Sequence, residues 1–364
     1  MPIALKRTLE LLHASDGTTY LLRGAADAEF EIAGAEPHER ALLDALQAGV
    51  DSLEDLGRRL EAAGHPVGAD ALTATLEQLS SLGLLEDEDL AQALGAETAE
   101  RYDRQLAYFS DARPGQAARL QHRLTTSRVA IVGVGGLGTW TAAALACSGV
   151  GHLTLVDDDR VELRNLNRQF LYRTADVGRR KVEAAADALR AFDPGLGLTA
   201  IAERVAGPED ARRVVAGHDF AVELADWPPH DLSRWLDAAC WRDGIPRITA
   251  AQFPPRMRLG PTYLRGATPC LRCQEEQARR EYPLYDELVA MRRAHPPRTP
   301  ILGPGAAMLG AAVAGDVVAQ LTGLSAPATL GAALIVDQRD LSIARHELVA
   351  GPGCGDCAAV SPGR

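Results

Sequence analysis

Apolar positions in the first 90 residues follow a strand pattern and then a helix pattern. Residues 7–13, 19–24 and 29–34 alternate apolar and polar side chains, and the Asp-Gly step between the first two segments is typical of a β-hairpin. Three segments with leucines at helical spacing follow, each ending at a glycine, at residues 36–49, 51–64 and 69–83. This order predicts a small winged-helix-like α+β domain over residues 1–90.

Modules of this shape often bind DNA, but the charges here argue against it. The third predicted helix carries Glu77 and no arginine, and the chain has a net charge of −11 with no basic block. Neutralising nucleic-acid phosphates takes clustered lysines and arginines. The sequence therefore predicts no nucleic-acid partner and leaves peptides and nucleotides.

A different pattern begins after an acidic connector at residues 91–100. A predicted strand at 128–132 leads through a glycine-rich turn into a helix, and a second strand at 152–156 ends in acids. The turn contains Gly133, Gly135, Gly136 and Gly138. Glycines let the backbone approach a ligand, and the following helix points its free amides at phosphate. We therefore expect residues 101–364 to form a Rossmann-like α/β nucleotide-binding domain.

Two cations decide which nucleotide is expected. Asp157 ends the second strand and could accept from both ribose hydroxyls, which suits NAD as well as ATP. Beyond it, "NLNRQ" contains Arg168, and Lys181 lies in the first turn of a predicted helix, although this chain has only two lysines among 38 basic residues. Such a pair can stabilise the charge that develops during attack on the α-phosphate of ATP. Hydride transfer has little need of it.

The segments "RYDRQ", "GVGGLG", "SGVGHLTLVDDD", "NLNRQ" and "VGRRK", in this order, resemble the ThiF/MoeB and ubiquitin-activating superfamily of adenylyltransferases. The resemblance implies that Gly136 approaches the nucleotide and that Asp157 holds the ribose, with Asp159 and Asn165 in the same site. It implies that Arg168 and Lys181 contact the phosphates.

The resemblance also implies a homodimer and a magnesium ion. Arg104, in "RYDRQ", would reach across the dimer interface to the partner's ATP. The magnesium aspartate of the family follows a later strand, and Asp226 stands after the predicted strand 220–225. Asp226 could also cap the next helix, and the two roles can coexist. Trp227 stands where the family usually has a polar residue, so placement of the substrate beside the metal is the least defined part.

Four cysteines form two pairs that are typical of a zinc site. Cys270 and Cys273 lie in "CLRC", and Cys354 and Cys357 lie in "CGDC". Two such pairs in a reducing compartment predict a closed four-thiolate structural zinc site rather than disulfides. We expect the zinc to tie the C-terminal tail to the loop before the final helix.

The two other cysteines, Cys147 and Cys240, lie in apolar helical segments and are expected in the core. Ubiquitin-type activators need an exposed thiolate between the first cysteine pair and the last helix. Residues 274–303 contain no cysteine and are expected to form a loop over a bound peptide tail. The sequence therefore predicts no thioester on this chain.

The N-terminal domain resembles the PqqD-like domains of ribosomal-peptide biosynthesis, which take a leader peptide as an extra strand. An unpaired sheet edge can do this because its backbone groups are free. A packing or dimerisation module is the alternative. The two-part layout resembles the adenylating enzymes of bacteriocin biosynthesis, of the microcin C kind.

The favoured interpretation is an ATP- and magnesium-dependent adenylyltransferase that activates the C-terminal carboxylate of a precursor peptide, with a downstream modifying enzyme as a further partner. The alternatives are a sulfur-carrier activator of the ThiF/MoeB kind and a leader-binding scaffold without catalysis. The start of the chain lacks a cleavage-type signal. No window approaches the roughly 20 apolar residues of a membrane span, so a cytoplasmic protein without a membrane partner is expected.

Overall fold

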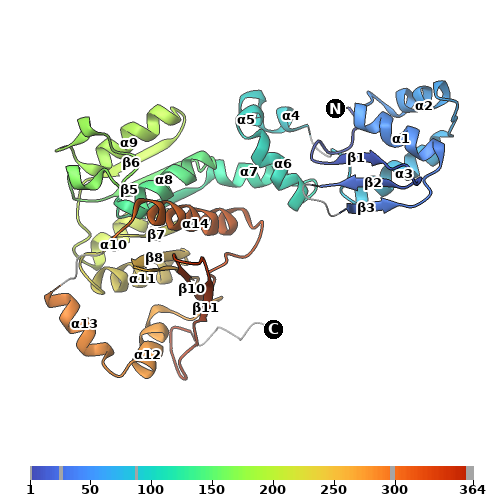
Figure 1. Cartoon of the computed structure of the whole chain (residues 1–364). Coiled ribbons are helices and arrows are strands. Elements are labelled where there is room, and N and C mark those ends of the chain that lie inside the picture. The colour runs from blue at the N-terminus through green and yellow to red at the C-terminus, as the bar shows by residue number, and fades with distance from the viewer. Residues whose placement is uncertain (1, 24–27, 87–88, 296–299, 358–364) are drawn as a thin grey trace. The chain divides into compact units, whose positions relative to one another are not determined.

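The computed structural model describes residues 2–23, 28–86, 89–295 and 300–357. The chain divides into two compact units, Met1–His122 and Arg123–Arg364, shown along the colour gradient of Figure 1. The division falls later than the boundary near residue 101 that we expect between the N-terminal domain and the nucleotide-binding domain. That expected boundary stays a prediction.

The first unit begins with an antiparallel sheet in the order β1-β2-β3, followed by helices (Figure 1). Its leucines pack into one core that includes Leu21 of β2, Leu46 of α1 and Leu60 of α2, each at most 1% exposed. The strands are β1 (Glu10–His13), β2 (Thr19–Leu22) and β3 (Ala28–Ile32). The helices are α1 (Pro37–Ala48), α2 (Leu53–Ala62), α3 (Ala69–Ser81), α4 (Leu90–Leu94), α5 (Ala96–Arg101), α6 (Asp103–Ala112) and α7 (Ala117–Thr126), the last of which crosses the division.

The element order of the N-terminal module agrees with the sequence pattern, three strands followed by three helices. The expected connector at 91–100 is different, because α4 and α5 occupy most of it. Asp89 begins α4 by accepting a hydrogen bond from the Gln92 amide at 2.9 Å, which is a standard N-cap. The acidic segment is therefore helical.

The second unit is built on an eight-stranded mixed sheet in the order β11-β10-β9-β8-β7-β4-β5-β6. The five strands from β6 to β8 are parallel, and β9, β10 and β11 pair antiparallel. Strands β4 (Arg128–Val132) and β5 (His152–Val156) have the bounds expected from the sequence. The others are β6 (Gly197–Ile201), β7 (Phe220–Glu223), β8 (Arg247–Phe253), β9 (Arg256–Tyr263), β10 (Ala332–Asp337) and β11 (Ile343–Glu347).

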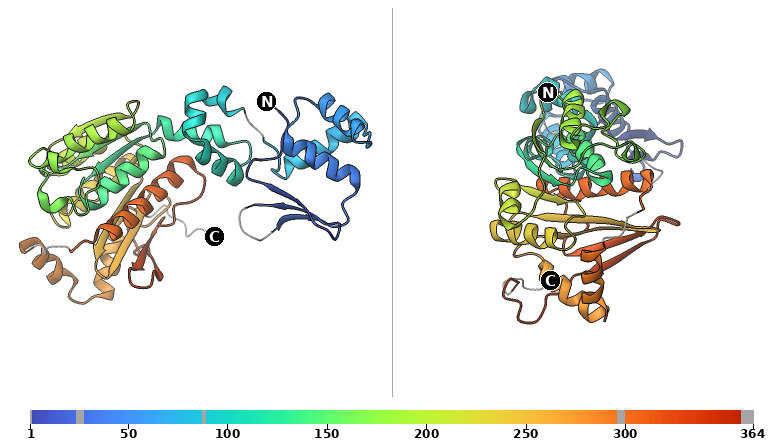
Figure 2. Two further views of the ribbon diagram at one scale, coloured as in Figure 1. Left: turned by 45° about the horizontal axis from the view of Figure 1, so that its top comes forward. Right: turned by 90° about the vertical axis from the view of Figure 1, so that its left-hand side faces the viewer.

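Helices cover both faces of this sheet (Figure 2). A Cβ on Gly138 of α8 would lie 3.9 Å from Ile131 of β4, whereas the next residue, Val132, packs with α10 and α11. Successive residues of a strand point to opposite faces, so α8 and the α10–α11 pair lie on opposite sides. The helices are α8 (Gly136–Cys147), α9 (Lys181–Phe192), α10 (Pro208–Val215), α11 (Asp231–Asp243), α12 (Leu271–Glu281), α13 (Tyr285–Ala294) and α14 (Gly303–Thr322).

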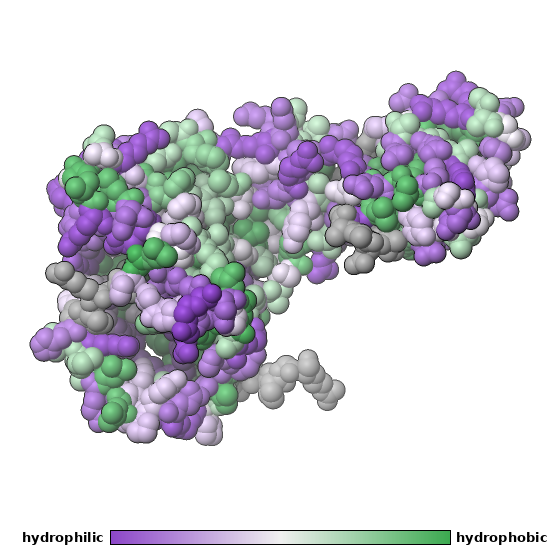
Figure 3. Space-filling model, in the orientation of Figure 1, coloured by the Kyte–Doolittle hydropathy of each residue, from purple (hydrophilic) through white to green (hydrophobic). Residues whose placement is uncertain are grey.

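Helix α14 corrects the expectation that no segment has the length and hydropathy of a membrane span. The helix has 20 residues, and an 18-residue window of it has a mean hydropathy of 1.3, with half of that window buried inside the protein. The helix packs closely on α8, where Thr141 Oγ1 donates to Gly310 O at 3.0 Å. It also carries the buried Asp316, which accepts from the amides of Ala328 and Thr329. These contacts are those of a core helix. On the face seen in Figure 3, hydrophilic and apolar residues are mixed over both units.

Candidate active site

The glycine-rich turn joins β4 to α8 and is closely packed. Gly133 has φ +98°, and a Cβ on it would lie 2.5 Å from the Ala225 amide nitrogen. A Cβ on Gly138 would lie 2.0 Å from Gly133 O, so neither position accepts a side chain. Gly135 precedes α8 and provides no side-chain cap. The first-turn amides of α8 next to Gly136 are therefore suited to an anion.

Asp157 holds this turn from the end of β5. One carboxylate oxygen accepts from the Val134 amide at 2.8 Å and the other from the Asp159 amide at 2.9 Å. Burial raises the pKa of Asp157, while the charge of Lys181 opposes the shift. The carboxylate thus connects the turn to the acidic segment.

Lys181 is the first residue of α9 and is 5% exposed. Its Nζ donates to Asp159 Oδ2 at 2.6 Å and lies 3.9 Å from Asp157 Oδ1. The structure therefore brings together three residues that the sequence assigned to the nucleotide site, from segments more than 20 positions apart.

Arg168 lies over the start of α8. A Cβ on Gly136 would be 3.6 Å from its Cδ, and its Nη1 donates to Arg164 O and Asn167 Oδ1. Its Nε is buried and has no hydrogen-bond partner among the described residues. Burying such a donor unpaired is costly. Arg168 can therefore accept an additional anionic partner.

Asn165 is buried in the same loop, and its role there is at least partly structural. Its Oδ1 accepts from the Glu162 amide at 2.9 Å and caps the short turn Leu163–Asn165. That atom is committed to the loop. The expected contact of Asn165 with a nucleotide stays a prediction.

Asp226 follows β7, which ends at Glu223 rather than at the expected residue 225. The segment reaches the glycine turn, because Ala225 is the residue that a Cβ on Gly133 would strike. Asp226 has no hydrogen bond or ion pair within the described part of the chain and is open to solvent on one side. The protein around it nevertheless desolvates the carboxylate and, together with Glu223, raises its pKa. An unpaired carboxylate oxygen is a suitable ligand for Mg²⁺.

Arg104 belongs to α6 of the first unit. Its side chain is fully exposed, and its Nε lies 3.8 Å from Asp103 Oδ2. Exposure is what a residue that reaches another chain requires. The expected role across a dimer interface stays a prediction.

The four cysteines of the two pairs lie together, as the sequence predicts. Cys270 Sγ lies 3.8 Å from Cys273 Sγ and 3.7 Å from Cys354 Sγ, and Cys273 Sγ lies 3.6 Å from Cys357 Sγ. Tetrahedral zinc with Zn–S bonds of about 2.3 Å separates its sulfurs by about 3.8 Å. The spacing therefore fits zinc and is too long for a disulfide. All four are buried.

The cluster differs from the prediction in what it connects. Cys270 precedes α12 and Cys273 lies within it, so the cluster joins the C-terminal segment to α12 and not to the loop before α14. Amides of Gly351 and Cys270 donate to Cys273 and Cys357 sulfurs. Such hydrogen bonds stabilise thiolates.

Two further expectations need correction. Residues 274–303 are mainly α12 and α13 rather than a loop, since the charged residues of this segment form ion pairs at helical spacing, such as Arg279 with Glu275 at 3.9 Å. Cys147 is exposed, because it ends α8 after Leu145 and Ala146 have taken the core positions. Cys240 is buried as expected, and burial raises its pKa to about 12.

Sequence reasoning missed the aromatic support of the site. Tyr172 is buried and its hydroxyl donates to Val134 O at 2.7 Å, which holds the glycine turn. Trp140 Nε1 donates to Arg168 O at 3.2 Å, and its ring stacks on Phe170 at 4.4 Å between centroids. The only signal was the "RQFLY" segment directly after Asn167.

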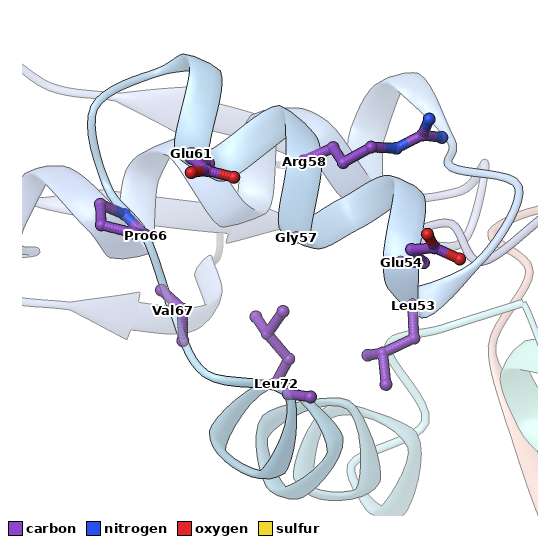
Figure 4. A pocket seen from close by; sticks show the side chains of 9 residues that line it. Leu53, Glu54, Gly57, Arg58, Glu61, Pro66, Val67 and Leu72 are labelled. Carbon is purple, nitrogen blue, oxygen red and sulfur yellow. The ribbon is translucent and has the colours of Figure 1, made fainter.

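The first unit has a hollow of its own between α2 and α3 (Figure 4). Its volume is about 360 Å³. Leu53 and Leu72 point into it from the two helices, and Glu54, Arg58 and Glu61 stand around it. None of the residues predicted for the nucleotide site lines this hollow.

Comparison with known proteins gives consistent relatives. The ThiF family matches residues 102–356. The molybdopterin-synthase adenylyltransferase of Escherichia coli is 31% identical over 71% of this chain and 95% of its own length.

Solved structures extend the likeness to the N-terminal part. MccB of Escherichia coli with ATP has a TM-score of 0.76 at 22% identity, covering 98% of this chain and 100% of that one. The same enzyme has been solved in complex with N-formylated MccA. PaaA has a TM-score of 0.75 at 27% identity, over 94% of this chain and 99% of that one.

Proposed function

This chain belongs to the ThiF family and is an ATP-dependent adenylyltransferase, and from that premise we propose that it activates the C-terminal carboxylate of a ribosomally made precursor peptide. A carboxylate oxygen attacks the α-phosphorus of ATP, and the bond from that phosphorus to the β-phosphate bridging oxygen breaks. The products are an acyl-adenylate and pyrophosphate. No protein nucleophile takes part.

The observation that carries the proposal is that Lys181 and Arg168 both lie near the glycine turn, Lys181 beside Asp157, which holds the turn, and Arg168 against Gly136. Lys181 rests on Asp159, whose side chain is 61% exposed, and Arg168 keeps an unpaired Nε beside Gly136. Negative charge grows on the pyrophosphate as it leaves, and fixed cations that meet this charge lower the barrier. We infer that Asp157 also accepts from the ribose hydroxyls, with the lone pairs that the Val134 and Asp159 amides leave free.

Two metal ions fit the donors present. Asp226 would hold Mg²⁺, which when bound neutralises phosphate charge, because its carboxylate has no other partner in the described residues. The four clustered cysteines would hold a structural zinc that joins the C-terminal segment to α12.

The first unit supports a peptide as the substrate. Strands β1 and β3 are both sheet edges, so either can pair with a leader peptide in an extended conformation. Holding the leader raises the effective concentration of a weakly bound C-terminal tail at the active site to the order of mM. The structural likeness of this chain to MccB covers 98% of the chain and therefore includes the first unit. We further propose a cytoplasmic homodimer that passes its product to a modifying enzyme.

A sulfur-carrier activator is the second candidate. The molybdopterin-synthase adenylyltransferase of Escherichia coli is 31% identical to this chain over 95% of its own length. This identity favours activation of a small carrier protein. The two candidates differ in the N-terminal unit. The match to the molybdopterin-synthase adenylyltransferase covers 71% of this chain, and the ThiF family match begins only at residue 102.

Exchange of labelled pyrophosphate into ATP distinguishes the candidates. The protein is incubated with ATP, Mg²⁺ and either the peptide encoded by a short reading frame beside its gene or a carrier protein ending in Gly-Gly. We expect exchange with the leader-bearing peptide, and a loss of exchange when the leader is removed. Exchange with the carrier alone would support the second candidate, and peptide binding without exchange would indicate a scaffold.

A further inference from the structure

The N-terminal end of α14 has free amides and no capping side chain. Leu302 precedes the helix and contributes no side-chain hydrogen bond, and the first turn reads Gly303-Pro304-Gly305. Pro304 has no N–H, and the Ala306 amide donates to Leu302 O, so among the described residues the free amides of this turn are those of Gly303 and Gly305. The first amides of a helix have no partner within it, and over 20 residues the helix dipole adds positive potential there. This end is therefore suited to a negatively charged group.

Gln252, on β8, is buried against this helix end. It is 3% exposed, and neither Nε2 nor Oε1 has a hydrogen-bond partner in the described residues. A Cβ built on Gly305 would lie 3.4 Å from its Nε2, so the amide faces the first turn of α14. Leaving buried amide atoms unpaired costs about 1–3 kcal/mol each, which points to a ligand as the missing partner.

Gln338 approaches the same glycine from another strand. It follows β10, its main-chain amide donates to Pro255 O, and its buried Nε2 is also unpaired in the described part of the chain. Its Oε1 would lie 2.8 Å from a Cβ on Gly305. Two side-chain amides thus converge on a glycine whose missing side chain leaves the room that they occupy.

This position adjoins the nucleotide turn. A Cβ on Gly303 would lie 2.8 Å from Asn167 O and 4.0 Å from Arg168 Cα. Arg168 in turn covers Gly136. A group held at the start of α14 is therefore separated from the glycine turn by one residue.

We propose that the α14 N-terminus, Gln252 and Gln338 form the subsite for the terminal residue of the peptide, an inference that rests on the proposed function and specifies its substrate class. The Gly303 and Gly305 amides, the Gln252 NH₂ group and, with its side-chain amide turned, the Gln338 NH₂ group donate to the carboxylate. Gln252 Oε1 accepts from the backbone N–H of the terminal residue of the peptide. A C-terminal carboxylate carries such an N–H beside it, whereas a side-chain carboxylate does not. Neutral donors also hold the carboxylate without protonating it.

Direct binding tests the subsite without catalysis. Saturation-transfer NMR with the full chain compares N-acetylglycine with N-acetylglycinamide, in the absence of ATP. We expect N-acetylglycine to bind and the amide to bind about tenfold more weakly, because the amide lacks the charge that the donors meet. Equal binding of the two probes would overturn the subsite.

Variants locate the binding. Gln252→Leu and Gln338→Leu should each weaken N-acetylglycine about tenfold, by the cost of one lost hydrogen bond to a charge. Gly305→Ala should do the same by filling the space. Gly315→Ala is the matched control, because it lies on the same helix with no atom within 4 Å. Thermal melts confirm folding, and unchanged binding in folded Gln252→Leu and Gly305→Ala would refute the assignment.

Exchange kinetics separate this inference from the proposed function. A pool of N-acetylated tripeptides with free carboxylates serves as substrate at millimolar concentration, and Gln252→Leu should raise KM for the pool with KM for ATP unchanged. Wild-type exchange that is insensitive to Gln252→Leu would overturn the subsite and leave the function standing. Binding that depends on Gln252, without any wild-type exchange, would do the reverse.

Discussion

The only two lysines of this chain lie one in each unit, and both are buried, Lys6 at 3% and Lys181 at 5% exposure. Lys6 donates to Ser110 O at 2.7 Å and lies 3.8 Å from Asp111. Ser110 belongs to the last turn of α6, where carbonyls lack helical partners and the dipole favours a cation. Lys6 is therefore held by partners within the fold.

Lys181 is equally buried but differently partnered. Its short contact is to Asp159, a side chain that is 61% exposed at the edge of the glycine turn. An exposed carboxylate can leave at little cost, because water replaces its hydrogen bonds. The comparison teaches that two equally buried lysines can differ in how firmly their partners are held: the Asp111 side chain beside Lys6 is 19% exposed and the Asp159 side chain beside Lys181 is 61% exposed.

The largest expected effect is the loss of activity on replacing Lys181. Lys181→Ala should reduce pyrophosphate exchange by at least about a thousandfold, on the scale of losing one charge-stabilising group. Lys181→Arg should not restore it, since a planar fork does not replace a compact ammonium. Leader-peptide binding should be unchanged.

Arg190→Ala on the exposed side of the same helix is the matched control. It should keep wild-type exchange. If Lys181→Ala also kept the wild-type rate, the phosphate role of Lys181 would be wrong.

Replacing Lys6 should lower the stability of the first unit without lowering activity. Lys6→Met should cost about 3 kcal/mol of local stability in the first unit, because it leaves the buried Ser110 carbonyl at the end of α6 without its donor. Asp111 keeps its ion pair with Arg23 at 3.7 Å. Exchange per folded molecule should not change. Hydrogen exchange of the α6 amides measures the loss, with Glu77→Ala, an exposed position on α3, as the control. A stable Lys6→Met unit would mean that the buried contact is dispensable.

Arg104 tests whether a second chain completes the site of Lys181. Arg104→Ala and Lys181→Ala subunits are each expected to be inactive, but an equal mixture should recover about a quarter of wild-type exchange, because about half of the dimers are then mixed and each mixed dimer contains one intact site. The measurement is exchange after mixing and refolding at equal amounts. No recovery would indicate sites built within one chain.

The smallest effect concerns the pH dependence of the second unit. His218 accepts from Thr154 Oγ1 at 2.7 Å and donates to Ala216 O, and burial lowers its pKa below 6.5. Between its folded pKa and 6.5 the unfolded chain binds more protons, so stability falls as the pH drops through this window. His218→Gln should flatten that slope by less than about 1 kcal/mol in denaturant titrations. Exposed His346→Gln is the control, and an equal change in both variants would exclude this origin.

The nucleotide turn could be predicted from sequence because its constraints are local. A turn that leaves no room for a Cβ at Gly133 must contain glycine, and a helix that starts at Lys181 shows its period in consecutive residues. The four-cysteine cluster could also be predicted from the sequence, because each pair supplies two metal ligands within four positions.

The rest required tertiary structure. Cys147 is exposed because of the side on which α8 ends. Most of the described residues from 274 to 295 belong to α12 and α13, although the prolines and charges of residues 274–303 resemble those of a loop.

Residues outside the motifs show most clearly what cannot be predicted from the sequence. Gln252 and Gln338 stand in segments that no motif marks, and each is an ordinary polar residue in isolation. Only the antiparallel pairing of β8, β9 and β10 and the position of α14 bring them to one glycine. Local backbone requirements are written in neighbouring residues, whereas the meeting of distant side chains depends on strand register and helix placement that only the folded chain determines.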